Sequence, residues 1–359
     1  MKGKLISTAQ VAVAAFAMSG ASVAFAQSSV TLYGILDAGI EYNSNSGGKD
    51  LVQYASRHVP QFFGLSGQED LGGGESAFFR YTQTIATANG VAGPKESYVG
   101  LADTSFGRVS LGRQYDLVAD LLSYFSEYYM SVSGVHPGDF DRSAGTYLNN
   151  AVKYRTPVYD GFSGALMFSF GSTSTGTTNA GNSQGIELDY NDNQRLRATV
   201  VYLNVRGVTA TPFNSLGVTS LYGSTFAPGA TVLQNESILA VGGYYDWQTW
   251  RLMATYTNTR LTPPDRADAE TIETYDVGAN KSLSPSLSVG AGYSYSKLES
   301  YKWNIWHAHV DYFLSKSTDL YLRVVQEFAG AGQHAVLFLE NPSSNSRQLV
   351  VGGGITHRF

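Results

Sequence analysis

Apolar and polar side chains alternate one by one through much of this chain. The first clear example is the segment SSVTLYGILDAGIEY, residues 28–42. One of its faces carries Val30, Leu32, Gly34, Leu36, Ala38 and Ile40, and the other carries Thr31, Tyr33, Ile35, Asp37, Gly39 and Glu41. Successive side chains of a strand point to opposite sides. This period of two therefore predicts a strand with one face for lipid or a core and one mostly for water.

Similar alternating segments recur to the end of the chain. They lie at about 60–70, 74–87, 95–103, 106–114, 148–157, 163–171, 184–191, 195–206, 236–248, 249–260, 271–283, 286–298, 302–315, 317–329 and 347–359. With the first segment, they predict about sixteen strands. After the N-terminus, no apolar run reaches the roughly 20 residues that a membrane-spanning helix needs, which argues against a helix-bundle transporter.

The spacers between these segments alternate between short and long. Tight turns are expected at 71–74, 103–107, 157–162, 191–194, 246–249, Ser284–Pro285 and Ser315–Lys316. Longer polar connections are expected near 43–59, 88–94, 115–147, 172–183, 207–235, 261–270 and 330–346, and only 299–301 is short. A barrel with tight turns at one rim and long loops at the other produces this order, whereas a soluble sandwich has no reason to sort its loops. We therefore expect an all-β fold, a transmembrane antiparallel β-barrel of about 16 strands.

The last residues, LVVGGGITHRF, keep the alternation up to Phe359. Chain ends are usually frayed and polar because they have no partner. In a closed barrel, however, the last strand pairs with the first. Its outward face would then consist of Leu349, Val351, Gly353, Ile355 and Phe359.

The first 26 residues have the features of a secretory signal peptide. Lys2 and Lys4 precede an apolar stretch, and Ala24 and Ala26 flank Phe25 in an A-x-A arrangement. A membrane anchor is the weaker alternative because the apolar core is short. We expect cleavage after Ala26, which leaves residues 27–359 as one barrel domain.

Charge and cysteine content narrow the function further. Without the two lysines of the signal peptide, the 24 basic residues become 22 against 29 acidic ones, a net charge of −7. This balance disfavours a nucleic-acid partner. The chain has no Cys, so an exported protein of this kind needs stabilisation other than disulfides. Closing the sheet into a barrel supplies it, because a barrel has no unpaired edge.

Several segments also resemble landmarks of one family, the trimeric general porins of Gram-negative outer membranes, β-proteobacterial type. They are SSVTLYGILDAGIEY, GLSGQEDLGGG, SYVGLADTSFGRVSLGRQYD, AVKYRTPVYDGF and the terminal GGGITHRF, in family order. The resemblance implies a homotrimer of sixteen-stranded barrels in the outer membrane, surrounded by lipid, with a third external loop folded into the lumen. It also implies a C-terminal Phe359 read by the barrel-assembly machinery, and a water-filled channel for passive diffusion of small hydrophilic solutes and ions.

The longest spacer, residues 115–147, has apolar residues that a loop in water would not need. Leu117, Leu121, Leu122, Phe125 and Tyr129 could pack against an inner barrel wall. The acidic residues Glu127, Asp139 and Asp141 would then line a narrow passage. An external Ω-loop is the alternative.

Arginines are expected on the wall that faces this loop. The resemblance maps two family arginines onto Arg113 and Arg155, whereas Phe62 stands where the family has a third. Arg57 or Arg80 could compensate; alternation places Arg80 inward.

The expected position of Arg113 contains a conflict. Strict alternation puts Arg113 on the lipid side with Val109 and Leu111. An Arg facing lipid in mid-bilayer costs about 2–4 kcal/mol. We therefore expect a lumenal position, reached by a bulge at Gly112 or because the strand has already ended.

Catalysis and metal binding find little support in the sequence. His307, His309 and Asp311 share one strand face, but residues at i, i+2 and i+4 spread over about 13 Å, too far for one ion. No familiar nucleophile, zinc or phosphate-loop motif occurs. We expect no catalytic residue, metal or cofactor. A substrate-specific channel, an outer-membrane barrel enzyme and a structural or adhesive barrel remain alternatives to the passive channel, and the sequence leaves open whether anions or cations are preferred.

Overall fold

The computed structural model describes residues 29–125, 147–171, 182–210, 216–218, 220–221, 224–225, 231–263 and 269–359. Its main sheet is antiparallel and has seventeen strands. They are β1 (Ser29–Ser46), β2 (Lys49–Ala55), β3 (Phe62–Gly72), β4 (Glu75–Ile85), β5 (Ala92–Asp103), β6 (Gly107–Tyr115), β7 (Tyr147–Arg155), β8 (Phe162–Ser169), β9 (Ser183–Asn191), β10 (Leu196–Ala210), β13 (Thr231–Trp247), β14 (Trp250–Thr262), β15 (Glu270–Ser284), β16 (Leu287–Leu298), β17 (Tyr301–Phe313), β18 (Thr318–Ala329) and β19 (Arg347–Arg358). The short strands β11 (Ser220–Leu221) and β12 (Ser224–Thr225) form a separate ladder.

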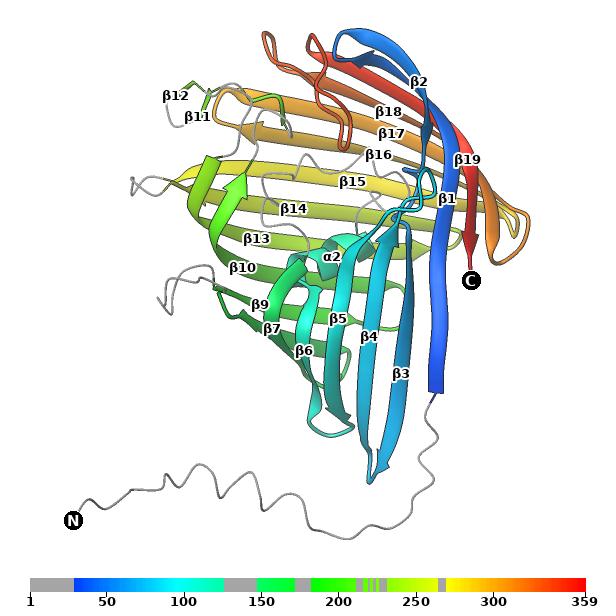
Figure 1. Cartoon of the computed structure of the whole chain (residues 1–359), viewed down its shortest axis with the longest axis vertical. Helices are drawn as coiled ribbons and strands as arrows, with labels where there is room; N and C mark the ends of the chain where they lie inside the picture. Colours follow the sequence, from blue (N-terminus) through cyan, green and yellow to red (C-terminus); the bar gives the residue numbers. More distant parts are fainter. Residues whose placement is uncertain are drawn as a thin grey trace, which may run out of the picture.

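The sheet closes on itself where the two ends of the chain meet. β19 pairs with β1 from Ile35↔Arg358 to Asn43↔Val350, and Gly34 and Phe359 exchange two backbone hydrogen bonds of 3.0 and 3.1 Å. Figure 1 shows the C-terminal end beside β1. The predicted closure by the last strand is confirmed, and it leaves the barrel without a free edge.

The sixteen-strand prediction is also confirmed, because β2 and β3 together form one barrel strand. β2 pairs with Gly39–Asn43 of β1, and β3 pairs with Ser29–Ile35 of the same strand. Residues 56–61 lie between them and form no strand. We call these six residues the strand break.

The predicted rims are correct, with one wrong connection. As expected, tight turns join the strand pairs at one rim. The first strand, β1, begins at this rim, and the last strand, β19, ends there. The long polar connection expected near 43–59 is wrong: β1 continues to Ser46, turns at Gly47 and Gly48, and returns as β2. Both glycines have positive φ, which a hairpin turn of this kind requires. The sequence did not predict this extension because residues 43–48, NSNSGG, are polar on both faces of the strand.

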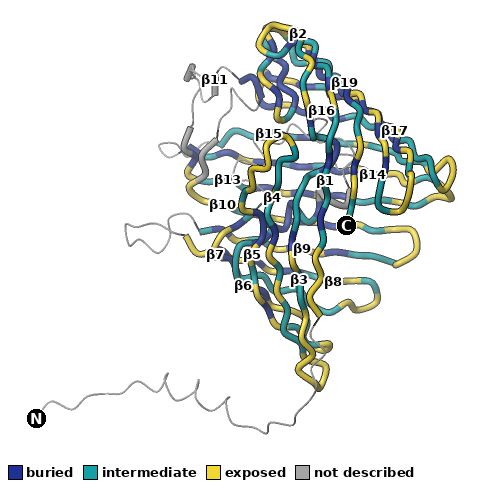
Figure 2. Tube along the Cα trace, turned by 45° about the vertical axis from the view of Figure 1, so that its right-hand side comes forward, coloured by how far each residue is buried: buried dark blue, intermediate teal, exposed yellow. Residues whose placement is uncertain are grey.

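The two faces of the wall follow the predicted alternation. On β17, Ile305, His307 and His309 are buried on the inside, whereas Trp306 is exposed on the outside. Figure 2 shows exposed and buried residues alternating along the strands. The exposed outer face is rich in Val, Leu, Ile, Phe and Tyr, as expected for a surface covered by lipid.

Part of the inside is apolar and is covered by a helix. α2 (Leu117–Phe125) begins where Asp116 accepts a hydrogen bond from the Ala119 amide at 2.7 Å, an N-cap. Leu117, Val118 and Leu121 are buried in one cluster with inward residues of β10 and β13. Figure 1 shows α2 within the barrel outline. No described helix is long and apolar enough to cross a bilayer.

Leu117, Val118 and Leu121, at the start of the 115–147 spacer, therefore lie on the inner side of the wall. The other expectations for this spacer concern the side chains of Leu122 and Phe125 and the residues Tyr129, Glu127, Asp139 and Asp141. The structure does not describe these two side chains or these four residues.

Candidate functional site: a charged basin in the barrel lumen

A cavity of about 430 Å³ lies on the inner side of β4 to β10. We call it the basin. Its charged lining comprises the basic Arg80, Arg108, Lys153, Arg155 and Arg197 and the acidic Glu96, Asp120 and Glu187. The strands contribute all of these except Asp120, which comes from α2. The helix thus closes the basin from inside the barrel.

Arg155 connects the wall to the helix. Its guanidinium donates to Glu187 at 2.5 Å and to Asp120 at 3.2 Å. Lys153, two residues earlier on the same face of β7, donates to Asp120 at 2.9 Å. One helix carboxylate is therefore shared by two cations. This arrangement fixes α2 against β7 and balances Lys153 and Arg155 against Asp120 and Glu187.

Three further cations complete the wall. Arg80 lies 3.6 Å from Glu96, and its side chain is 41% exposed. Arg197 donates to Asp189 at 2.9 Å. Arg108 lies over the Phe78 ring, 4.4 Å from its centroid, and forms no ion pair within the described residues. Arg108 is thus the basin cation whose charge is least neutralised.

The basin carries an excess of positive charge. Five basic side chains face three acidic ones, although the chain as a whole is acidic, with a formal net charge of −5. Charged groups on low-dielectric walls concentrate the opposite ion in the water between them. The geometry therefore suits the passage of small anions.

A lysine lies against Phe62, the residue that stands where the family has its third arginine. Lys95 is buried, and its Nζ lies 3.8 Å from the centroid of the Phe62 ring, a cation–π contact. Arg57 is held elsewhere, by Glu41 at 3.2 Å and by Glu340. Of the two arginines expected to compensate, Arg80 lines the basin and Arg57 does not.

Arg113 lies outside the basin, contrary to our expectation. The bulge at Gly112 exists: the β6–β7 register shifts there, and Gly112 has a φ of 137°. It does not turn Arg113 into the cavity, because Arg113 pairs with Ser97 on the outer side. Its guanidinium donates to the Lys95 carbonyl at 3.0 Å and to Asn149 at 2.6 Å. These bonds satisfy the charge at the end of the strand.

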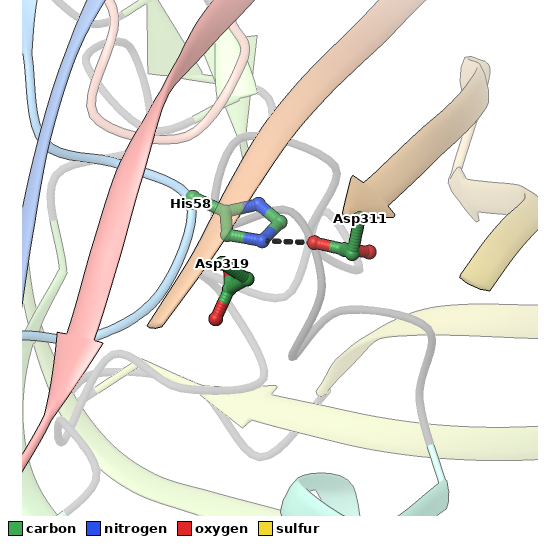
Figure 3. Close-up of side chains that lie close together, drawn as sticks. All are labelled: His58, Asp311 and Asp319. Carbon is green, nitrogen blue, oxygen red and sulfur yellow. Dashed lines mark hydrogen bonds and ion pairs between the residues drawn. The ribbon is translucent and has the colours of Figure 1, made fainter. Parts of the chain in front are cut away.

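A second polar cluster lies on the wall formed by β17, β18, β19 and β1. Here Arg323 donates to Glu41 at 2.6 Å, and both side chains are 1% exposed. His58 of the strand break meets Asp311 and Asp319 (Figure 3). Within the described residues, these three form the group whose spacing suits a metal ion. His307 and His309, the candidates set aside above, do not belong to it.

The family model for Gram-negative porins matches residues 10–328 of the chain. The chain belongs to the Gram-negative porin family. As a porin, it forms a water-filled channel in the outer membrane for passive diffusion of small hydrophilic solutes and ions.

Individual relatives agree with this membership. An outer membrane porin of Bordetella pertussis is 28% identical, with 94% of this chain and 96% of the relative covered. Outer membrane porin protein 32 of Delftia acidovorans is 34% identical over 46% of this chain and 50% of its own length. Among solved structures, an anion-selective porin from Comamonas acidovorans has a TM-score of 0.79 at 21% identity, covering 93% of this chain and all of that one. OmpT of Vibrio cholerae in its trimer form has a TM-score of 0.67 at 13% identity, covering 92% and 99%.

The porin's basin contains two of the residues expected from sequence and several that were missed. Arg80 and Arg155 line it. Strand parity would have found Lys153 from Arg155, and Arg108 from the outward Val109. Asp120 carried no such signal, because its partners lie on other elements. Lys95, which contacts Phe62 but does not line the basin, was missed because the β4–β5 register shifts beside it, which breaks the alternation.

Proposed function

We propose that the basin is the selectivity filter of this porin and that it favours small anions. The observation that carries this proposal is the excess of five basic over three acidic side chains around the cavity. Arg108 contributes most, since no ion pair neutralises it within the described residues. The structural neighbour described as an anion-selective porin supports the same sign.

The proposed mechanism uses no cofactor and no catalytic residue. Anions gather near the uncompensated guanidinium groups, and the opposed charges of the wall and α2 orient dipolar solutes as they pass. We further propose that Glu127, Asp139 and Asp141 form the acidic side of the passage. Arg113 is not part of the proposed filter.

The zero-current potential of the wild-type channel tests the proposal. It is measured across a planar bilayer between 0.1 and 1 M KCl, where both ions have similar mobility. We expect the sign that corresponds to preferential chloride flux. The preference should weaken at molar salt on both sides, because the Debye length falls to about 3 Å. A potential of the opposite sign would refute an anion-selective basin.

We also propose that the porin assembles as a homotrimer, by analogy with the trimer form of the Vibrio cholerae protein. Sedimentation in mild detergent should give the mass of three chains, and monomers alone would contradict it. The N-terminus of the mature protein should be Gln27 if residues 1–26 are a signal peptide. Deleting Phe359 should reduce assembled porin if the assembly machinery reads it.

A further inference from the structure

The strand break carries His58 away from the barrel wall. β2 ends at Ala55 and β3 begins at Phe62, and both pair with β1. Between them, His58 is only 1% exposed. Its contacts are not with the neighbouring β4 but with β1, β17 and β18, which lie on the other side. The break therefore crosses the inner face of β1 and β19.

Two glycines make this crossing possible. Gly39, Gly354, Tyr321 and Asp311 form one row across β1, β19, β18 and β17. A Cβ atom on Gly39 or Gly354 would lie 2.6 or 2.7 Å from the Tyr321 hydroxyl. Because both positions are glycines, the Tyr321 side chain has room to lie over the row. The His58 ring stacks on the Tyr321 ring, with 3.9 Å between centroids and an interplanar angle of 10°.

Hydrogen bonds then fix the position of His58. Its backbone amide donates to Asp37 Oδ2 at 3.0 Å, and its Nε2 lies 2.8 Å from Asp311 Oδ1. The second oxygen of Asp37 accepts from Thr356 at 3.4 Å. The imidazole is thus positioned by three strands before any ligand arrives.

Two carboxylates beside this imidazole have unused buried oxygens. One ligand atom each from His58, Asp311 and Asp319 lies within 4.8 Å of the other two, and Figure 3 shows the imidazole next to both carboxylates. Asp311 and Asp319 are 3% and 1% exposed. Among the described residues, Asp311 Oδ2, Asp319 Oδ2 and His58 Nδ1 form no hydrogen bond. His309 Nε2 lies 3.4 Å from Asp311 Oδ2, and Arg358 pairs with the other oxygen of Asp319. Burying such groups unsatisfied is unfavourable, because they lose their hydrogen bonds to water.

We propose that His58, Asp311 and Asp319 bind one divalent transition-metal ion, with Zn²⁺ as the best match. Imidazole nitrogens and carboxylate oxygens both bind Zn²⁺, and three protein ligands leave its fourth position open, whereas Ca²⁺ and Mg²⁺ prefer oxygen ligands alone. Binding would draw the three ligand atoms together and replace the His58–Asp311 hydrogen bond. The ligated imidazole would be neutral. Asp37 would not bind the ion but would orient His58, because it accepts the hydrogen bond of the His58 backbone amide.

The proposed ion would fasten the strand break to β17 and β18. These strands are separated from β2 and β3 by β19 and β1, so the ion would join parts of the wall that share no backbone hydrogen bonds. An ion that binds only the folded barrel stabilises it by mass action. Zn²⁺ should therefore raise the temperature at which the folded barrel melts.

Two experiments on the purified, chelator-treated porin test the proposal. Isothermal titration with Zn²⁺ should give one site per chain, and Ca²⁺ should bind at least tenfold more weakly. His58→Gln and Asp319→Asn should each weaken Zn²⁺ binding at least tenfold. The matched control is His357→Gln, a histidine at the rim that contacts Thr318, and it should bind like the wild type.

Crystals soaked in Zn²⁺ provide the second readout, which does not depend on variant folding. An anomalous difference peak between His58, Asp311 and Asp319 is the expected result. A peak only elsewhere, or none at saturating Zn²⁺, would overturn the proposal. So would undiminished binding by a folded His58→Gln or Asp319→Asn variant.

Discussion

The inner wall of this porin has two charged regions that use similar residues in opposite ways. Around the basin, Arg80 and Arg155 have side chains that are 41% and 27% exposed to water. On the wall of β1 and β18, Arg323 and Glu41 are each 1% exposed and bond each other. The first region leaves charge accessible to a passing ion, and the second neutralises it out of reach.

This difference separates the selectivity of the channel from the stability of the barrel. A charge that water reaches acts on ions across a distance set by screening, about 8 Å at physiological salt. A buried pair contributes little to that field, but removing one partner leaves an uncompensated charge in a dry site. Strand alternation places both kinds of charge on the lumenal face, so it does not separate selectivity from stability. The exposure of each ion pair does separate them.

The largest expected effect is on stability, from Arg323→Leu. Removing one partner of a buried pair usually costs 3–5 kcal/mol. We expect about 3 kcal/mol, the lower end, because Arg57 still contacts Glu41. Guanidinium unfolding of the detergent-solubilised porin, followed by the gel shift of the folded form, measures it.

Arg251→Leu is the control for that experiment. Arg251 bonds Asp246 at 2.7 Å, but both side chains are well exposed at the rim. Exposed pairs contribute about 0–1 kcal/mol. Equal destabilisation by the two variants would show that burial does not separate the two regions.

Arg155→Gln should have a smaller effect on stability and a clear effect on selectivity. Glu187, which is almost fully buried, loses its partner, and an unsatisfied buried acceptor costs about 1–3 kcal/mol. The loss of positive charge should also shift the zero-current potential toward cations. If the variant is destabilised but its zero-current potential is unchanged, Arg155 contributes to stability and not to selectivity, like the buried pair of Arg323 and Glu41.

The smallest effect concerns a turn outside the membrane wall. The backbone amides of Gln194, Leu196 and Arg195 donate to Asp192 and hold the pKa of its carboxyl below its usual value. A lowered pKa means that the ionised form stabilises the fold above the unfolded-state pKa and that this contribution is lost as the pH falls through the folded-state pKa. Asp192→Asn should therefore be slightly less stable than the wild type at pH 7, and the difference should shrink as the pH falls below the unfolded-state pKa. A difference that does not shrink at acidic pH would contradict this explanation.

The barrel could be predicted from the sequence, but the basin only in part. Strand alternation is local, so the strand count, the rims and the inward position of Arg80 could be derived from neighbours along the chain. The strand break could not, because His58 finds its partners on β17 and β18, more than 250 residues away. Lys95 was missed because it lies at a register shift, where parity no longer gives direction. Arg113 failed for the opposite reason: strict parity gives its outer side, and the lumenal position taken from the family resemblance and the cost of facing lipid does not match the structure.

The most direct test of the central claim is the zero-current potential of Arg108→Gln. Arg108 has no ion-pair partner within the described residues. Its removal therefore leaves no carboxylate unpaired and should not change stability. A unit charge about 8 Å from an ion in water contributes about 0.5 kcal/mol, or about twofold in permeability for each ion. In a 0.1 to 1 M KCl gradient, we predict a shift toward cations for Arg108→Gln and none for Arg251→Gln. An unchanged potential in folded Arg108→Gln channels of normal conductance would contradict the claim that the exposed cations of the basin set the selectivity.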